Sequence, residues 1–390
     1  MKKVCIITGS RAEYGLLKPL IKKLKDSKSL ELQIIATCTH LSPEFGLTYQ
    51  EIENDGFKIN EKIEILLSSD TSIGISKSMG LAMISFCEAF DRLKPNIIII
   101  IGDRYEIFAA ASAATVARIP IAHIHGGETT EGAFDESFRH SITKMSYLHF
   151  TSTEEYRKRV IQLGEDPQRV FNVGAIGIEN IKTIDLLEKD KLQETLGYQF
   201  GEKTILVTFH PTTLENNTAE NQFKNLLDAI EEFETIKVIF TKSNADIGGK
   251  IINNMIDEYV KRNNQKSVAY TSLGSVKYLS VMKYCDVVVG NSSSGIIEAP
   301  AFMIPTINIG DRQKGRVQAK SVINCEPIKN DIITSLNKAF SEEFKKALKD
   351  TKNPYGDGNV TDRIITQIES YLLNDKIQLK KAFYNIDIDN

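Results

Sequence analysis

Cysteine is scarce in this chain, and its spacing gives no sign of a disulfide framework or a metal site. The five cysteines are odd in number, widely separated and without a C-x-x-C pair: Cys5, Cys38, Cys87, Cys285 and Cys325. Most of them stand among apolar residues, where a thiol packs as a small hydrophobic side chain. This pattern is typical of a protein kept in a reducing compartment.

An excess of charge of either sign is also missing. Lys and Arg number 48 and Asp and Glu number 51, which leaves a net charge of −3 over 390 residues. A balance this even gives no reason to expect nucleic acid as a partner. No basic block or basic amphipathic helix indicates a membrane surface either.

Long hydrophobic runs are absent. Lys2 and Lys3 could open a signal peptide, but the apolar run at 4–7 is very short and Arg11 soon follows it. The longest uncharged helical stretch, Ile107–Ala117, is far short of the ~20 residues that cross a bilayer. We therefore expect a soluble cytoplasmic protein with no membrane partner.

Two cofactor signatures are missing as well. The loop after the first apolar run, at 9–14, is neither the G-x-G-x-x-G of dinucleotide-binding proteins nor a P-loop. Neither nicotinamide nor Mg-ATP chemistry follows from it. We expect no cofactor and no metal.

Short apolar runs alternate with segments of helical periodicity along most of the chain. Several runs are blocks of Ile and Val, as strands covered on both faces require. The predicted strands lie at 4–8, 32–37, 96–101, 119–124, 170–173, 204–209, 237–241, 287–290 and 306–309, and predicted helices include 15–25, 107–118, 219–233, 248–262 and 362–373. This repeated order predicts an α/β protein with doubly wound parallel sheets.

The length suggests more than one domain, since domains average about 150 residues. A seam is expected between Glu165 and Leu196, where a polar helix separates two strand–helix series. We predict two Rossmann-like domains of similar size facing a cleft, residues 1–170 and 171–360. A helix at 361–375 follows, and the charged tail at 376–390 is expected to pack loosely.

Polar residues follow the predicted strands of the first half, at the edge where open α/β sheets bind ligands. Arg11 stands at a helix start that suits a phosphate, although a structural turn with a solvated arginine is an equal alternative. Asp103 and Arg104 follow a strand of five isoleucines. Taken alone, Asp103 is better explained as the N-cap of the next helix.

The strand at 119–124 is followed by a dense group of ionisable residues, His-Gly-Gly-Glu at 125–128 and Asp-Glu-Ser-Phe-Arg-His at 135–140. Packing alone does not explain such a group, because burying ionisable side chains costs stability. The group therefore makes the neighbouring Asp103 a candidate for chemistry as well. Histidines inside apolar runs, such as His123, are expected to be core residues.

The second half supplies a complementary set. His210 follows one strand, and Asn-Ser-Ser-Ser-Gly at 291–295 follows another, with Glu298 one helical turn later. Serine hydroxyls and backbone N–H groups at a helix start can hold phosphate, and Glu298 could meet a ribose. Arg312, in the basic loop at 310–316, suits the same diphosphate. Each piece alone fits a capped surface helix or a solvated charge run, but together they favour a nucleotide-diphosphate site.

Taken in order, these motifs resemble the hydrolysing UDP-N-acetylglucosamine 2-epimerases, most closely the bacterial enzymes that make N-acetylmannosamine for sialic acid capsules. The resemblance covers nearly the whole chain. It rests on Gly-Ser-Arg-Ala-Glu-Tyr-Gly at 9–15, Gly-Asp-Arg-Tyr-Glu at 102–106, His-Ile-His-Gly-Gly-Glu at 123–128, Arg-His-Ser-Ile-Thr-Lys-Met-Ser at 139–146, Asn-Ser-Ser-Ser-Gly at 291–295, Gly-Asp-Arg-Gln-Lys-Gly-Arg at 310–316 and Tyr-Gly-Asp-Gly-Asn at 355–359. It implies a glycosyltransferase-B-type fold whose C-terminal helix crosses back to the first domain, and a homodimer or homotetramer.

The resemblance also implies a reaction. A proton leaves sugar carbon 2 and UDP is eliminated anti to it, which gives enzyme-bound 2-acetamidoglucal. Water then adds across the double bond and releases N-acetylmannosamine and UDP, the first step of sialic acid synthesis. Neither a metal nor nicotinamide is implied.

The resemblance assigns roles by position in this sequence. The carboxylates for acid and base work are Asp103 and Glu136, while His125, which stands where many relatives carry Glu, is a weaker candidate. His210 is a further catalytic candidate. The residues implied in UDP binding are Arg11, Arg104, His210, Ser292, Ser293, Glu298 and Arg312.

Four alternatives stay open. The same chemistry could act on a UDP-2,4-diacetamido-2,4,6-trideoxyhexose and feed legionaminic acid, since the two sugars differ only at carbons 4 and 6. A non-hydrolysing epimerase would retain UDP on its product. A glycosyltransferase with the same fold would need an acceptor, and a nucleotide-sugar-binding protein without catalysis would tolerate loss of the carboxylates.

Overall fold

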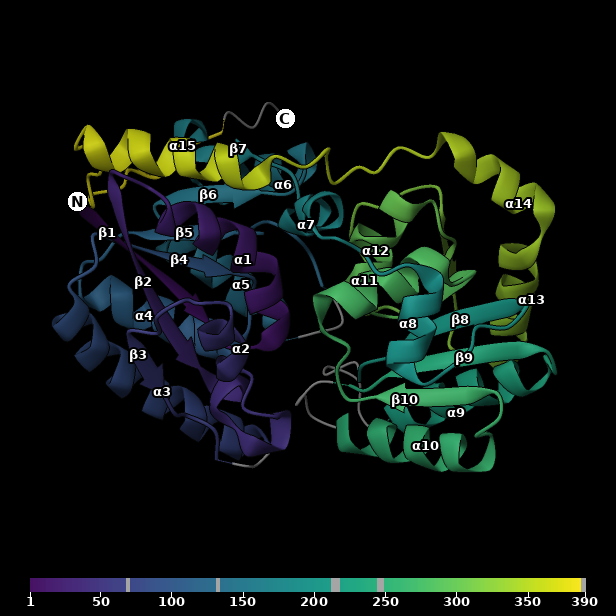
Figure 1. Ribbon diagram of the computed structural model, residues 1–390. Coiled ribbons are helices and arrows are strands. Elements are labelled where there is room, and N and C mark those ends of the chain that lie inside the picture. Colours follow the sequence, from purple (N-terminus) through teal and green to yellow (C-terminus); the bar gives the residue numbers. More distant parts are fainter. Residues whose placement is uncertain (68–70, 131–133, 212–217, 244–248, 387–390) are drawn as a thin grey trace. The chain divides into compact units, whose positions relative to one another are not determined.

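The structure is a computed structural model that describes residues 1–67, 71–130, 134–211, 218–243 and 249–386. The chain divides into two compact units. Unit 1 comprises Met1–Glu128, Asp135–Asn180 and Tyr355–Asn390, and unit 2 comprises Thr129–Phe134 and Ile181–Pro354. Each unit is an α/β domain built on one parallel sheet (Figure 1).

Unit 1 has a seven-stranded sheet in the order β3-β2-β1-β4-β5-β6-β7. Its strands are β1 (Lys2–Thr8), β2 (Leu30–Thr37), β3 (Glu61–Ile63), β4 (Ile97–Ile101), β5 (Ile121–Ile124), β6 (Leu148–Thr151) and β7 (Val170–Asn172). Its helices are α1 (Arg11–Lys25), α2 (Tyr49–Asn54), α3 (Ser72–Leu93), α4 (Tyr105–Val116), α5 (Asp135–Met145), α6 (Glu154–Gln162), α7 (Ile176–Thr183) and α15 (Val360–Leu373). The order reverses next to β1, as in doubly wound sheets.

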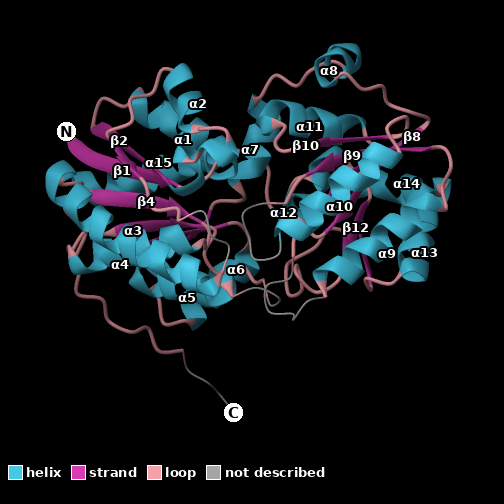
Figure 2. Cartoon of the chain, turned by 90° about the horizontal axis from the view of Figure 1, so that it is seen from below, coloured by secondary structure: helices cyan, strands magenta, loops and turns pink. Residues whose placement is uncertain are grey.

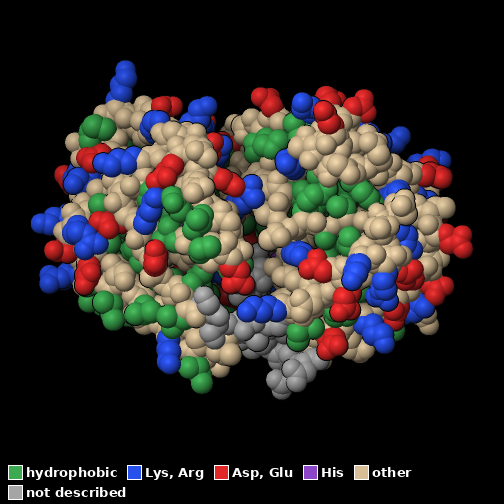
Figure 3. Space-filling model, turned by 60° about the horizontal axis from the view of Figure 1, so that its bottom comes forward, with side chains coloured by type: hydrophobic (Ala, Val, Ile, Leu, Met, Phe, Trp, Pro, Cys, Tyr) green, Lys and Arg blue, Asp and Glu red, His purple; other side chains and the backbone are tan. Residues whose placement is uncertain are grey.

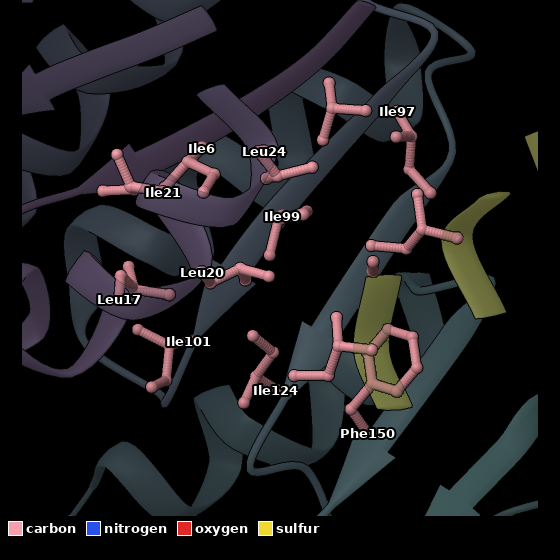
Figure 4. Close-up of a cluster of buried hydrophobic side chains, with 14 of the residues drawn as sticks. Ile6, Leu17, Leu20, Ile21, Leu24, Ile97, Ile99, Ile101, Ile124 and Phe150 are labelled. Atoms are coloured by element: carbon pink, nitrogen blue, oxygen red, sulfur yellow. The ribbon is translucent and has the colours of Figure 1, made fainter. Parts of the chain in front are cut away.

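The five isoleucines of β4 are all buried because the sheet is covered on both faces. Neighbouring residues on a strand point to opposite faces. Ile97, Ile99 and Ile101 therefore join one hydrophobic cluster with α1 (Figure 4), whereas Ile98 and Ile100 join another with α3 and α4. This is why β4 reads as an unbroken apolar block.

The C-terminal helix α15 packs on unit 1, which confirms the crossing helix that the resemblance implied. Its residues Val360, Ile364 and Ile368 are fully buried in the cluster that also holds α1. At its start, the Thr361 backbone N–H donates to the Glu179 carboxylate at 2.7 Å. In Figure 1 this helix, in yellow, lies in the unit that contains the N-terminus.

The division between the units lies at Asn180, ten residues beyond the boundary expected at 170. Helix α7 explains the difference, because its first part packs into unit 1. Ile176 belongs to the core of that unit, and the Asn180 side chain donates to the carbonyl of Gly15 at 2.8 Å.

The tail after α15 is expected to pack loosely, and most of its described residues are exposed. Lys381 nevertheless ties it to unit 1. Lys381 donates to the carbonyls of Lys144 and Ser146 at 2.8 and 2.6 Å. It also donates to the buried Glu165 carboxylate at 2.8 and 2.9 Å. The buried Glu165, which also bonds to Lys144 and His149, thus anchors Lys381 of the tail on unit 1.

Unit 2 has a six-stranded parallel sheet in the order β10-β9-β8-β11-β12-β13. Its strands are β8 (Lys203–Thr208), β9 (Ile236–Thr241), β10 (Ser267–Tyr270), β11 (Val287–Gly290), β12 (Thr306–Ile309) and β13 (Val322–Cys325). Its helices are α8 (Lys189–Leu196), α9 (Ala219–Glu231), α10 (Gly249–Arg262), α11 (Gly274–Tyr284), α12 (Ser293–Ile297), α13 (Lys329–Phe340) and α14 (Glu342–Ala347). Figure 2 shows the strands of each unit, in magenta, between their helices.

Helix α3 is mostly apolar, but it is not an uncharged stretch, because it includes Lys77 and Glu88. This is why it is longer than any uncharged stretch of the sequence. By length and composition it is the one helix in the described ranges that could cross a membrane. This is weak evidence, since core helices pass the same test, and Ala82 and Phe86 are fully buried in the core. On the face drawn in Figure 3, basic and acidic side chains are interspersed.

Candidate active site

Three neighbouring strands of unit 1 bring polar residues to one edge of the sheet. Asp103 follows β4, His125 and Glu128 follow β5, and Ser152 follows β6. These strands are adjacent in the order β4-β5-β6 and all run parallel. Their carboxyl ends therefore meet, as the sequence predicts.

Arg139 of α5 links two of these strand ends. Its side chain is 3% exposed, and Nη2 donates to Oδ2 of Asp103 while Nη1 lies 3.5 Å from Oε2 of Glu128. Asp103 therefore forms an ion pair. Its motif alone predicts that it caps the next helix, and that prediction was wrong. The N-cap of α4 is Arg104. The guanidinium fixes both carboxylates at the sheet edge.

His125 is held from both ring nitrogens. Its Nε2 accepts the backbone N–H of Ile176 at 3.4 Å, and Nδ1 lies 3.4 Å from Oε1 of Glu128. The same carboxylate oxygen accepts a hydrogen bond from Ser152 Oγ at 2.7 Å. Because Nε2 accepts, the assigned tautomer carries its proton on Nδ1, which points to Glu128.

Glu136 lies on α5, one turn before Arg139. Its Oε1 is 3.0 Å from Nε2 of His140, and both side chains are about a quarter exposed, at 23% and 26%. Residues three and four apart share one face of a helix. Glu136, Arg139 and His140 therefore lie together on α5. The carboxylate of Glu136 is more exposed than that of Asp103.

The two arginines expected at the phosphates both have acidic partners in unit 1. Arg11 opens α1 and forms an ion pair with Glu51 of α2 at 2.7 Å, with a third of its side chain exposed. Arg104 donates through Nε to the fully buried Glu106 at 2.7 Å. Both guanidinium groups are thus oriented by carboxylates near the ends of β1 and β4.

His123 is a core histidine, as expected. Its Nε2 donates to the Gly102 carbonyl at 2.8 Å, and Nδ1 lies 3.2 Å from Oγ1 of Thr143. Burial lowers the pKa of His123 to about 3, so the ring is neutral at physiological pH. It holds the backbone just before Asp103 in place.

In unit 2, Asn291 organises the residues after β8 and β11. Its side chain accepts the N–H of His210 at 2.7 Å and donates to the carbonyl of His210 at 2.8 Å. Its own carbonyl accepts from Arg312 Nη1 at 3.0 Å and from Gln313 Nε2 at 2.9 Å. His210 Nδ1 is 3.1 Å from Ser243 Oγ. Asn291 thus holds His210 and Arg312, which are far apart in the sequence, at one place in the fold.

Gly290 allows the close approach of β11 and β8. It has φ +133°, and a Cβ there would lie 1.9 Å from the Thr208 carbonyl oxygen, so no other residue fits. Ser292 then caps α12 and accepts the N–H of Ser294 at 3.4 Å. Ser293 begins α12, and Glu298 is the C-cap directly after its last residue. All three predicted residues therefore belong to one short segment.

Several residues of these networks carried no predicted role. Arg139 and Glu128 stood inside quoted motifs, but neither was assigned to the site. Asn291 was also not assigned, although it directly follows a predicted strand, the position where a signal was available. Ser152 follows β6, a strand that the sequence did not predict.

The described residues contain no group of three or more His, Cys, Asp or Glu side chains placed to hold a metal ion. Unit 2 has a cavity of about 650 Å³ beside the loop at 310–316. Asp311, Lys314 and Asn324 are among its lining residues, and the predicted UDP ligands are not.

The family model of UDP-N-acetylglucosamine 2-epimerases matches residues 22–369. The chain therefore belongs to the UDP-N-acetylglucosamine 2-epimerase family, and it is an enzyme of that family. Its fold agrees with a 2-epimerase of Neisseria meningitidis solved with UDP-N-acetylglucosamine, at TM-score 0.79 and 19% identity over 95% of this chain and all of that one. A structure of a 2-epimerase from Listeria monocytogenes gives TM-score 0.80 at 20% identity, covering 99% and 100% of the two chains.

Relatives of higher identity bear more specific names. One from Campylobacter jejuni, named GDP/UDP-N,N'-diacetylbacillosamine 2-epimerase (hydrolysing), is 47% identical over 88% of this chain and 89% of the relative. The polysialic acid biosynthesis protein P7 of Escherichia coli is 41% identical over 99% and 98%. A UDP-N,N'-diacetylbacillosamine 2-epimerase (hydrolysing) from Legionella pneumophila is 33% identical over 98% and 100%.

Proposed function

We propose that this chain is a hydrolysing 2-epimerase of UDP-activated 2-acetamido sugars. The observation that carries the proposal is the pair of carboxylates on adjacent elements of unit 1, Asp103 fixed by Arg139 and Glu136 bonded to His140. The reaction needs one group to remove the proton at sugar carbon 2 and another to deliver a proton. Two carboxylates in different surroundings suit those two tasks.

Asp103 and Glu136 are assigned the acid and base roles in preference to His125. The lone pair on His125 Nε2 already accepts a backbone N–H, and Nδ1 faces Glu128. A ring engaged in this way is a poor proton acceptor. His125 is therefore assigned to positioning Glu128, and through it Arg139.

The elimination leaves UDP as the departing group, and unit 2 supplies groups that suit it. The hydroxyls of Ser292 and Ser293 and the guanidinium of Arg312 are assigned to the diphosphate, with Glu298 at the ribose. His210, fixed by Asn291 and Ser243, is assigned to UDP and to assisting its departure. From unit 1, Arg11 and Arg104 are assigned to the phosphates. Water then adds to the 2-acetamidoglucal and the free 2-epimeric sugar leaves.

Two substrates are in competition. The sequence motifs favour UDP-N-acetylglucosamine, which would give N-acetylmannosamine, and the 41% identity to the polysialic acid protein over 99% of this chain supports that assignment. The 47% identity to the Campylobacter jejuni relative favours a UDP-2,4-diacetamido-2,4,6-trideoxyhexose. The ratio of kcat/KM for the two sugars decides between them.

The reaction class is tested by following each UDP-sugar with the purified enzyme by NMR and identifying the products. Free 2-epimeric sugar and free UDP support the proposal. A product that keeps UDP would identify a non-hydrolysing epimerase, and UDP release that requires an added acceptor would identify a glycosyltransferase. A homodimer or homotetramer in the cytoplasm stays a prediction, which light scattering and cell fractionation test.

A further inference from the structure

Gly9, directly after β1, lies between two buried carboxyl groups that the proposed mechanism does not use. Its N–H donates to Oε2 of Glu13, on α1, at 2.7 Å. A Cβ at Gly9 would lie only 2.5 Å from Oε1 of Glu106, on α4. The residues Glu13 and Glu106 are 8% and 0% exposed. Because β1 and β4 are neighbours in the sheet, both carboxyl groups lie at the edge that carries Arg11 and Arg104.

The two carboxyl groups are incompletely paired. Glu106 Oε1 accepts from Arg104 Nε at 2.7 Å, whereas Glu106 Oε2 and Glu13 Oε1 are buried without a hydrogen-bond partner among the described residues. Two buried carboxylates close together repel each other, and an unpaired buried oxygen costs free energy. A single proton held by the pair removes one of the two negative charges and so relieves the repulsion.

The other groups around the pair favour this arrangement. Burial and the Glu106 carboxylate raise the pKa of Glu13 to about 8, although Arg104 and the Gly9 N–H act against them and Asp103 adds to the rise. Cys38 and Tyr105 face the pair as neutral groups, since burial raises the pKa of each. His40 bonds to Thr8 and is neutral, because burial lowers its pKa to about 4. Arg11 is paired with Glu51.

We propose that Glu13 and Glu106 share one proton and form a positioning pair that sets how strongly this edge of unit 1 attracts a diphosphate. With the proton in place, the Arg104 charge is balanced by one carboxylate. When the proton leaves, a second buried negative charge stands beside Arg104 and opposes an anion. The inference rests on the proposed function, since it takes UDP as the anion at Arg11 and Arg104.

The test is calorimetric titration of the full chain with UDP between about pH 7 and about pH 9, where a phosphate has already completed its second ionisation, near pH 6. The wild type should lose about tenfold in UDP affinity as pH rises. This is the effect expected when one added, partly buried negative charge repels the diphosphate. Glu13→Gln should show no such loss. Glu106→Gln should also be flat, because removing its charge lets Glu13 ionise well below the tested range.

Glu53→Gln, an exposed acid of α2 paired with Lys62, is the matched control and should keep the wild-type slope. A wild-type affinity independent of pH, or an unchanged slope in Glu13→Gln, would overturn the inference. Absence of UDP binding at every pH would instead overturn the proposed function. In that case the pair can still be tested by NMR, through the ¹³C carboxyl signal of Glu13 in glutamate-labelled protein, which the Glu13→Gln variant assigns. A titration midpoint near pH 8 supports the pair. The ordinary glutamate midpoint of about 4.3 refutes it.

Discussion

Arg139 and Asp103 form an ion pair across 36 positions of sequence, between helix α5 and the loop after β4. The same guanidinium reaches Glu128, which follows β5. One buried cation thus fixes two carboxylates that come from different strand ends. Catalysis and stability should therefore both depend on this arrangement.

Replacing Asp103 by Asn should lower kcat by about 100-fold to 10,000-fold, the range expected for loss of a general acid or base. Affinity for UDP should change little, because the substitution keeps the shape of the side chain and lies outside the groups assigned to UDP. Steady-state kinetics and calorimetry measure the two quantities.

Glu136→Gln should behave in the same way. Ser141→Ala on the same helix, an exposed residue whose hydroxyl bonds only within α5, is the control and should be as active as the wild type. Near-normal turnover in both Asp103→Asn and Glu136→Gln would refute their assigned roles.

Arg139→Gln should destabilise the protein by about 3 kcal/mol, because it leaves two carboxylates at the sheet edge without their cation. Arg92→Gln offers the comparison, since Arg92 forms an ion pair with Glu61 while half of its own side chain is exposed, at 53%. Exposed pairs contribute little, because water screens the two charges. Urea unfolding followed by circular dichroism gives both values, and equal losses would contradict the account of Arg139.

Arg312→Ala should weaken UDP binding by about tenfold or more, as removal of a charge-assisted hydrogen bond does. Loss of its bond to the Asn291 carbonyl should add to this by loosening the segment that holds His210. Lys320→Ala, an exposed cation just beyond the same loop, should leave the dissociation constant unchanged. Calorimetric titration with UDP separates the two variants.

Lys381→Ala should destabilise unit 1 by about 2 kcal/mol at neutral pH, since the lysine bonds to a buried charged carboxylate. Burial raises the pKa of Glu165, but bonds from His149, Lys144 and Lys381 outweigh it and lower the pKa from 4.5 to about 2. A carboxyl whose folded pKa is depressed stabilises the protein above its unfolded pKa and loses that contribution as pH falls. The difference between Lys381→Ala and the wild type should therefore shrink from about pH 4.5 towards about pH 2, which denaturant titrations at several pH values measure.

Strands buried on both faces were the most predictable part of the fold. The runs at 287–290 and 306–309 match β11 and β12 residue for residue, because helices on both sides demand unbroken apolar side chains. The strands β3, β6, β10 and β13 were not predicted. Three of them, β3, β10 and β13, are edge strands with partly exposed residues, so no apolar block marks them. Strand β6 is fully buried, but two of its four residues are His149 and Thr151.

At the site, the residue types were predictable and their partners were not. Asp103 at the end of a buried strand signals chemistry or a helix cap, and only the packing of α5 shows that Arg139 is its partner. The contact that ties the tail to unit 1 could not be predicted for a related reason. In the sequence, Lys381 is one of many charges expected to be solvated. In the structure it bonds to Glu165, 216 positions earlier. Contacts between distant segments depend on the strand order, which local patterns do not encode.

The most direct test of the central claim is an NMR time course with each UDP-sugar, read for the form of the nucleotide and of the sugar. Free UDP and a free 2-epimeric sugar should form together in equal amounts, without any acceptor. When the reaction is run in D₂O, the product sugar should carry deuterium from the solvent at carbon 2. Accumulation of a 2-epimer still bonded to UDP, or no UDP release from either sugar, would contradict the claim that this enzyme is a hydrolysing 2-epimerase.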